Sequence, residues 1–278
     1  KAWAAPVAQL LALVLVGLVV GVLVNTIAKA ARGHGVPYIM ASVAIRGGRI
    51  PPRVAVDTAL TAGACIGAGG SAGPEGPIVQ IGSTIGSTIG QVLGMSTQRL
   101  RILAACGAAG GMSAIFGAPL AGVMFAVEVI LGNFAVQSLS PIVISSVLAS
   151  VTHQFFVAWE PRFHIAEHAF IHLREVPIIL VLGVLAAGVA ALFIRVFYVV
   201  EDGFQRWRIP NVLKPAVGML GVGVIAMFFP GVLGGGYRTI SAVLEGHMGV
   251  ELMGALVVGK LLATCFTVGS GNVGGLFA

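Results

Sequence analysis

Charged residues are scarce in this chain. Asp, Glu, Lys and Arg make up 9% of its 278 residues, whereas about one quarter of the residues of a soluble domain are charged. Apolar residues reach 57%, and the mean hydropathy is +1.00. These values exclude an ordinary soluble domain and predict an all-α integral membrane protein that crosses the bilayer several times.

Cysteines are also few. The chain has three, and none has a second Cys or a His at the spacing of a ligand pair; they are Cys65, Cys106 and Cys265. This excludes a disulfide framework and a zinc site, so we expect buried thiols. Three histidines have the helical spacing of metal ligands, but the charged residues around them favour a solvated loop: His164, His168 and His172. We therefore predict no metal site.

The sequence also lacks the patterns of a membrane-embedded enzyme. It shows no catalytic pattern of the serine–histidine, HExxH or paired-carboxylate type. Its 16 basic residues exceed its 10 acidic residues, but they are scattered along the chain and form no stripe for a nucleic acid. Basic loops on the cytoplasmic side of a membrane explain the excess better. We predict neither an enzyme, nor a cofactor, nor a nucleic-acid partner.

Apolar runs that can cross a bilayer are predicted at residues 2–30, 141–157, 176–200, 212–229 and 252–268. Shorter helices are predicted at residues 54–66, 100–115 and 120–131, a re-entrant half-helix at 38–45 and a short amphipathic segment from 234. Glycines four residues apart predict close packing of one helix on its neighbour: Gly82, Gly86 and Gly90. Arg46, Arg49 and Arg53 predict a basic cytoplasmic loop, with anion binding as the alternative.

Three segments rich in glycine and proline interrupt the apolar pattern, at residues 33–37, 67–77 and 269–278. Irregular backbone at membrane depth is tolerated only inside protein or around a cavity. Half-helices that begin at such breaks can point their N-termini at an ion near the middle of the membrane. A purely structural scaffold would not need three of them, so the pattern indicates ion transport.

Glu75 lies within the second break, in a chain where carboxylates are rare. Pro77 near the first turn of the following apolar segment predicts that Glu75 stands at a helix N-terminus. There, free N–H groups and the helix dipole favour an anion, either a carboxylate or a bound ion. A glutamate in a solvated turn is the alternative, but an ionised side chain at membrane depth indicates a functional site.

Three short motifs resemble those of a known family. GHGVP at residues 33–37 resembles GSGIP, GPEGP at 73–77 resembles GREGP or GKEGP, and GGLFA at 274–278 resembles the start of GxFxP. GAPLAGVMFAVE at 117–128 and LGGGY at 233–237 are similar to further segments of the same family. The chain thus resembles, over nearly all its length, the CLC family of chloride channels and chloride/proton exchangers.

This resemblance implies a plasma-membrane homodimer in which each subunit has its own chloride pore, built from two inverted halves. Residues 1–278 would form one incomplete transmembrane domain, with halves at 1–160 and 175–278, that lacks the first and last helices and the family's pore tyrosine. Glu75 matches the gating glutamate, which occupies an anion site and leaves it when protonated. The positions that match the anion site are His34, Gly35, Gly76, Leu276 and Phe277.

The departures from the family pattern concern selectivity and proton coupling. His34 stands where the family usually has an anion-coordinating serine, so it would either donate N–H to chloride, narrow the pore or alter its selectivity. Pro74 replaces a basic residue. Glu128 and Val129 match a pair of neighbouring positions in the family. In the exchangers, the residue at the second position relays protons, and here that residue is Val129. We expect passive conduction of chloride, with chloride/proton exchange through another route as the alternative. Glu128 itself either pairs with a loop cation or lies on an ion pathway.

Overall fold

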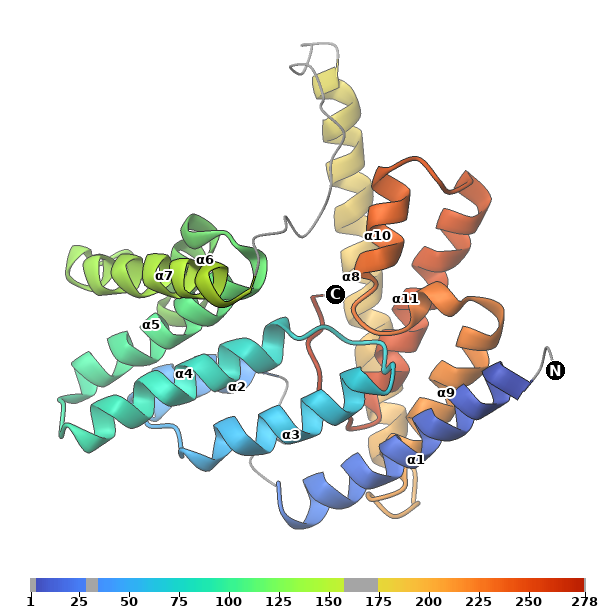
Figure 1. Ribbon diagram of the computed structural model, residues 1–278, viewed down its shortest axis with the longest axis horizontal. Coiled ribbons are helices and arrows are strands. Elements are labelled where there is room, and N and C mark those ends of the chain that lie inside the picture. The colour runs from blue at the N-terminus through green and yellow to red at the C-terminus, as the bar shows by residue number, and fades with distance from the viewer. Residues whose placement is uncertain (1–3, 29–34, 158–174, 278) are drawn as a thin grey trace.

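The computed structural model describes residues 4–28, 35–157 and 175–277, and over this part of the chain every regular element is a helix. This confirms the all-α prediction (Figure 1). The helices are α1 (Ala4–Thr26), α2 (Val36–Ile45), α3 (Arg53–Gly67), α4 (Glu75–Val92), α5 (Thr97–Phe116), α6 (Pro119–Phe125), a π-helical segment (Ala126–Leu131), α7 (Val136–Phe156), α8 (Val176–Arg206), α9 (Lys214–Phe228), a 3-10 turn (Pro230–Val232), α10 (Tyr237–Leu244) and α11 (Val250–Gly269).

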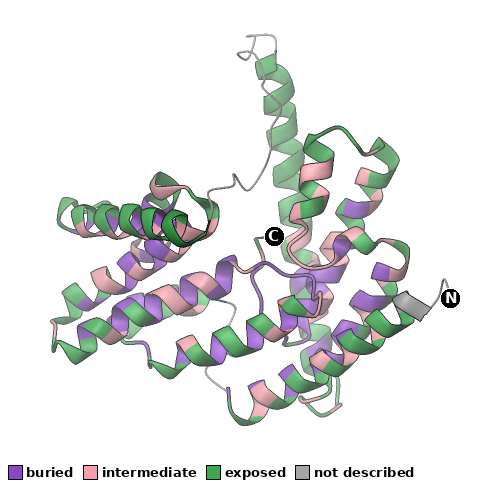
Figure 2. Ribbon diagram, viewed as in Figure 1, coloured by how far each residue is buried: buried purple, intermediate pink, exposed green. Residues whose placement is uncertain are grey.

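Five of these helices are long and apolar enough to cross a membrane: α1, α5, α7, α8 and α11. Three apolar pieces are shorter, namely α2, α9 and residues 119–131. This agrees with the short pieces predicted at 38–45 and 120–131, whereas residues 212–229 were expected to cross the bilayer and α9 has only 15 residues. Buried residues gather toward the middle of the molecule, whereas α8 is exposed along nearly its whole length (Figure 2). Its outward side chains are large and apolar, as expected of a helix whose solvent is lipid.

The helices form two groups with the C-terminal segment between them (Figure 1). Helices α4, α5, α6 and α7 pack against one another in the first group. Helices α8, α9 and α11 make the second group, and α1 packs on α9 although it begins the chain. The prediction that residues 1–160 and 175–278 are two repeated halves stays a prediction.

Several predicted boundaries are wrong. Helix α7 begins at Val136, so Pro141 lies inside it; the proline is close to the helix start and removes a single bond of the ladder. Helix α8 continues to Arg206 through Glu201 and Asp202, because a charged stretch ends the apolar span without ending the helix. Residues 126–131 form a π-helix where an α-helix was expected. The histidine-rich stretch at 164–172 lies outside the described residues.

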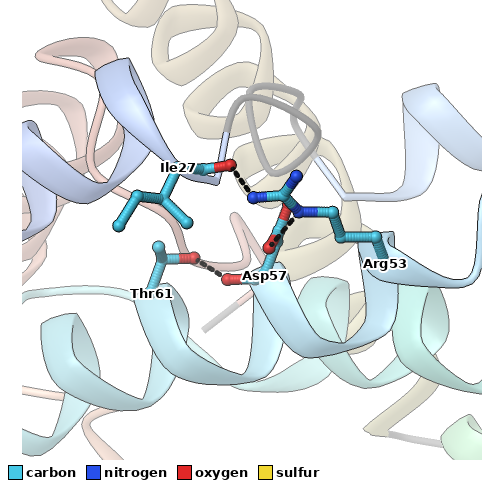
Figure 3. A network of polar contacts seen from close by, with 4 residues as sticks. All are labelled: Ile27, Arg53, Asp57 and Thr61. Carbon is cyan, nitrogen blue, oxygen red and sulfur yellow. Dashed lines mark hydrogen bonds and ion pairs between the residues drawn. The ribbon is translucent and has the colours of Figure 1, made fainter.

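Arg53 is the first residue of α3 and does not belong to the preceding loop. Its guanidinium donates from Nη2 to the carbonyl of Ile27 (2.5 Å) and from Nε to Oδ1 of Asp57 (3.4 Å), as Figure 3 shows. Asp57 is 4% exposed, and its backbone carbonyl accepts a hydrogen bond from Thr61 (2.6 Å). The network joins the end of α1 to the start of α3, so Arg53 has a structural role.

Helices α4 and α5 pack so closely that glycine is required at the contact. A Cβ atom on Gly82 would lie 2.2 Å from the carbonyl oxygen of Gly107, and one on Gly86 would lie 2.1 Å from that of Leu103. This confirms the predicted use of small residues for helix approach. The three cysteines are free and buried, as predicted.

Replacement of Gly107 by alanine should therefore destabilise the fold. The new Cβ would lie 1.9 Å from the carbonyl oxygen of Gly82, and overpacking of this kind costs about 1 to 3 kcal/mol. We expect a lower thermal unfolding temperature for the detergent-solubilised full-length protein, measured by loss of the monodisperse peak. Gly63→Ala in α3 is the control, because no atom lies within 4 Å of its added Cβ. Equal unfolding temperatures of the two variants would contradict the packing argument.

Candidate functional site

The second and third glycine-rich breaks, predicted at residues 67–77 and 269–278, lie against each other. Gly73 and Gly275 form an isolated antiparallel bridge in which the amide of Gly73 donates to Gly275 (3.0 Å) and the amide of Gly275 donates to Gly73 (2.7 Å). Two residues far apart in the sequence are thus joined between the two groups of helices. These bonds supply partners for backbone groups that have left the helical ladder, as membrane depth requires.

Further polar contacts hold the second break in place. The amide of Ser71 donates to the hydroxyl of Thr267 (3.1 Å), and the Ser71 hydroxyl lies 3.2 Å from that of Thr264. Both threonines belong to α11. The amide of Gly234, in the turn before α10, donates to the carbonyl of Gly69 (3.2 Å). The break before α4 is therefore fixed by α11 and by this turn.

All three predicted breaks contribute a glycine to the same place. A Cβ on Gly35 would lie 3.0 Å from the Cα of Gly76, and a Cβ on Gly76 would lie 3.1 Å from the Cα of Gly275. Gly35 also has a backbone φ of +52°, which residues other than glycine rarely adopt. The backbones of the three breaks approach one another as closely as they do because no side chain separates them.

Glu75 is the first residue of α4, at this meeting point. The side chain is 1% exposed. The hydroxyl of Tyr237 donates a hydrogen bond to Oε1 of Glu75, while Oε2 has no hydrogen-bond partner among the described residues. The predicted helix start is confirmed and the solvated-turn alternative is wrong, because the carboxyl group is buried.

Two residues of this site were not predicted. Tyr237 begins α10 and reaches Glu75 across 162 positions of sequence. Lys260, in the middle of α11, donates from Nζ to the carbonyls of Gly234 (2.5 Å) and Val232 (3.4 Å) and interacts electrostatically with Glu75. A lysine within an apolar span was a signal in the sequence, but its target depends on the folded structure.

The other expected anion-site residues differ in their surroundings. Gly35 and Gly76 lie at the meeting point. Leu276 is half-buried, and Phe277 is 63% exposed with its ring edge-on to that of Phe125, at 6.4 Å between centroids. His34 lies outside the described residues. That these residues bind an anion stays a prediction.

The two residues at the expected proton station lie on the π-helical segment. Glu128 is exposed, whereas Val129 is half-buried and packs against a buried apolar cluster that includes Ala105 and Ile130. The angle of about 100° that an α-helix would place between neighbouring side chains does not apply here, because the turns of a π-helix are wider. Either role considered for Glu128 stays a prediction.

A helical membrane domain with broken helices that meet at a buried acid has the architecture of an ion transporter. Solved structures of transporters have this fold. A crystal structure of a slow cyanobacterial Cl−/H+ antiporter matches with a TM-score of 0.87 and 24% identity, covering 99% of this chain and 65% of the other. A CLC-type fluoride/proton antiporter matches with a TM-score of 0.73 and 21% identity, covering 97% of this chain and 77% of the other.

The sequence comparisons identify the family. The model of the voltage-gated chloride channel family matches residues 16–278. A putative chloride channel protein ClcB-like of Ralstonia nicotianae is 30% identical, over 94% of this chain and 62% of its own length. The H(+)/Cl(−) exchange transporter ClcA of Vibrio vulnificus is 31% identical, over 92% of this chain and 56% of its own length. The chain belongs to this family, and it spans about three fifths of these relatives.

Replacement of Gly275 by alanine should disrupt the site. The added Cβ would lie 2.8 Å from the amide nitrogen of Gly76 and 2.9 Å from the carbonyl oxygen of Gly73, so the two breaks must move apart. We expect anion flux through the full-length protein in liposomes to fall by about tenfold or more, because binding groups displaced by about 1 Å lose most of their effect. Gly254→Ala in α11 has open space around its Cβ and should keep the original flux. Equal fluxes in the two variants would count against this site.

Proposed function

We propose that the protein that contains this chain moves chloride or a related small anion across the membrane through a pathway gated by Glu75. One observation carries the proposal: a carboxyl group with 1% exposure stands at the first residue of α4, where three glycine-rich breaks meet. The N-terminus of a helix stabilises negative charge. A place that holds a carboxylate can therefore hold a chloride ion when the carboxylate leaves.

Protonation supplies a reason for the carboxylate to leave. A charged carboxyl group gains from the helix N-terminus and from Lys260, whereas the neutral acid gains little from either. An anion then competes better for the place that the side chain held. We propose that no cofactor takes part and that the protein works as a homodimer in the plasma membrane, with the lipid bilayer around the exposed apolar helices.

Passive conduction is the form of transport that we propose. A proton-coupled exchanger of this family needs a second protonatable group, and Val129 occupies the matching position. Chloride/proton exchange through another route is the second candidate, favoured by the exposed carboxyl group of Glu128 next to Val129. The named relatives include both a putative channel and an exchanger.

Glu75→Gln tests the gate. Glutamine keeps the size of the side chain and resembles the protonated acid at every pH. Chloride flux into liposomes that contain the full-length variant should lose most of its dependence on pH, because the glutamine side chain has no proton to gain or lose. Glu251→Gln, at an exposed position in the first turn of α11, is the matched control and should keep the pH profile. A Glu75→Gln variant with the original profile would exclude this gate.

The absence of coupling has its own test. A chloride gradient is imposed across liposomes while the membrane potential is set independently, and proton movement is recorded together with chloride flux. We expect the current to reverse at the Nernst potential of chloride, because Val129 has no form that can carry a proton. Proton uptake against its gradient, driven by chloride, would support the exchanger instead.

A further inference from the structure

We propose that Tyr237 positions the Glu75 gate and that Lys260 holds Tyr237 in the place from which it does so. This inference rests on the proposed function, because it assigns a role to residues that act through Glu75. It adds the hydroxyl group of a residue of α10 and a half-buried lysine of α11 to a site whose acid belongs to α4.

Tyr237 contacts Glu75 directly, and it bonds to only one of the two carboxyl oxygens. Tyr237 is half-buried at the first position of α10, and its hydroxyl donates to Oε1 of Glu75. Oε2 of the same carboxyl group has no hydrogen-bond partner among the described residues. Within that part of the chain, a single hydrogen bond therefore fixes the position of a buried side chain.

Lys260 attaches the turn that carries Tyr237. Its ammonium group donates to the carbonyls of Gly234 and Val232, and the amide of Gly234 donates in turn to Gly69 in the break before α4. The turn is thus bonded to α11 on one side and to the second break on the other. Both bonds act just before the residue whose hydroxyl reaches Glu75.

Few charged or titratable groups surround the carboxyl group. Tyr237 from α10 donates the hydrogen bond, and Lys260 from α11 interacts with Glu75 electrostatically without forming a direct ion pair in the described part of the chain. Described residues of α2, α3 and α5 supply neither a hydrogen bond nor an ion pair to it. A change in Tyr237 therefore acts on Glu75 without a competing partner that could replace the lost bond.

The hydroxyl of Tyr237 stabilises Glu75 most when the acid is charged. A hydrogen bond to an ionised carboxylate is stronger than one to its neutral form and favours the charged state. Loss of the hydroxyl makes the charged side chain less stable in the break. The gate should then open at a lower proton concentration, which means at higher pH.

Tyr237→Phe removes the hydroxyl and keeps the ring. In the full-length protein in liposomes, the pH of half-maximal chloride flux should rise by about one unit, the size expected for a bond of this kind. Tyr198→Phe on α8 is the control, because the Tyr198 side chain is 59% exposed and its replacement should leave the midpoint unchanged. An unchanged midpoint in Tyr237→Phe, with the pH response of the original protein intact, would overturn the inference.

The double variant Glu75→Gln/Tyr237→Phe separates positioning from a general structural effect. If Tyr237 acts through Glu75, the double variant should have the pH-independent flux of Glu75→Gln alone. If the tyrosine change instead scales the flux by the same factor at all pH values and in both backgrounds, its role is structural and the inference is wrong. A pH-dependent flux in Glu75→Gln itself would refute the proposed function, so the two failures are distinct.

Lys260→Met tests the attachment of the turn. Methionine keeps much of the length of the side chain and loses its charge and its donors. The midpoint should again rise, and the combined Lys260→Met/Tyr237→Phe variant should shift by less than the sum of the two single shifts, because both changes remove the same hydrogen bond. Fully additive shifts would show that Lys260 acts by its charge alone and would overturn its assigned role.

Discussion

Backbone groups at membrane depth need hydrogen-bond partners, and this requirement governs the centre of the structure. The segment between α3 and α4 leaves the helical ladder, yet Gly69, Ser71 and Gly73 all form hydrogen bonds with residues beyond position 230. The second break therefore depends on α11 and on the turn before α10. Neither group of helices can form the site alone, which explains why the buried acid lies between them.

The same arrangement surrounds the carboxyl group of Glu75 with groups that favour an anion. An isolated charge inside protein is costly, and the cost falls when a helix N-terminus, a hydroxyl donor and a cation lie nearby. Here α4, Tyr237 and Lys260 supply these three features. Features that stabilise a carboxylate also stabilise a halide ion, which is the physical basis of our proposal that an anion takes the place of the side chain.

The sequence alone predicts the breaks and Glu75, but it does not predict the distant residues that bond to them. Glycine and proline are local signals, so the breaks and the position of Glu75 at a helix start could be predicted. The hydrogen bond to Tyr237 joins residues 162 positions apart, and Lys260 reaches its carbonyls only when the turn before α10 packs against α11. The π-helical segment could not be predicted either, because residue propensities hardly distinguish it from an α-helix.

The surroundings of Val129 differ from those of Tyr237 beside Glu75, and the difference bears on the side from which a proton would reach Glu75. Val129 packs against the buried apolar cluster beside α5, where a moving charge would be costly. Tyr237 and Arg238 instead line an open cavity of about 520 Å³ next to the turn that holds Tyr237. Tyr237 lines this cavity and also bonds to Glu75, whose own side chain is not among the residues that line it. The gate that we propose at Glu75 would then exchange its proton past Tyr237, on the side of α10, and would need no second protonatable group at Val129.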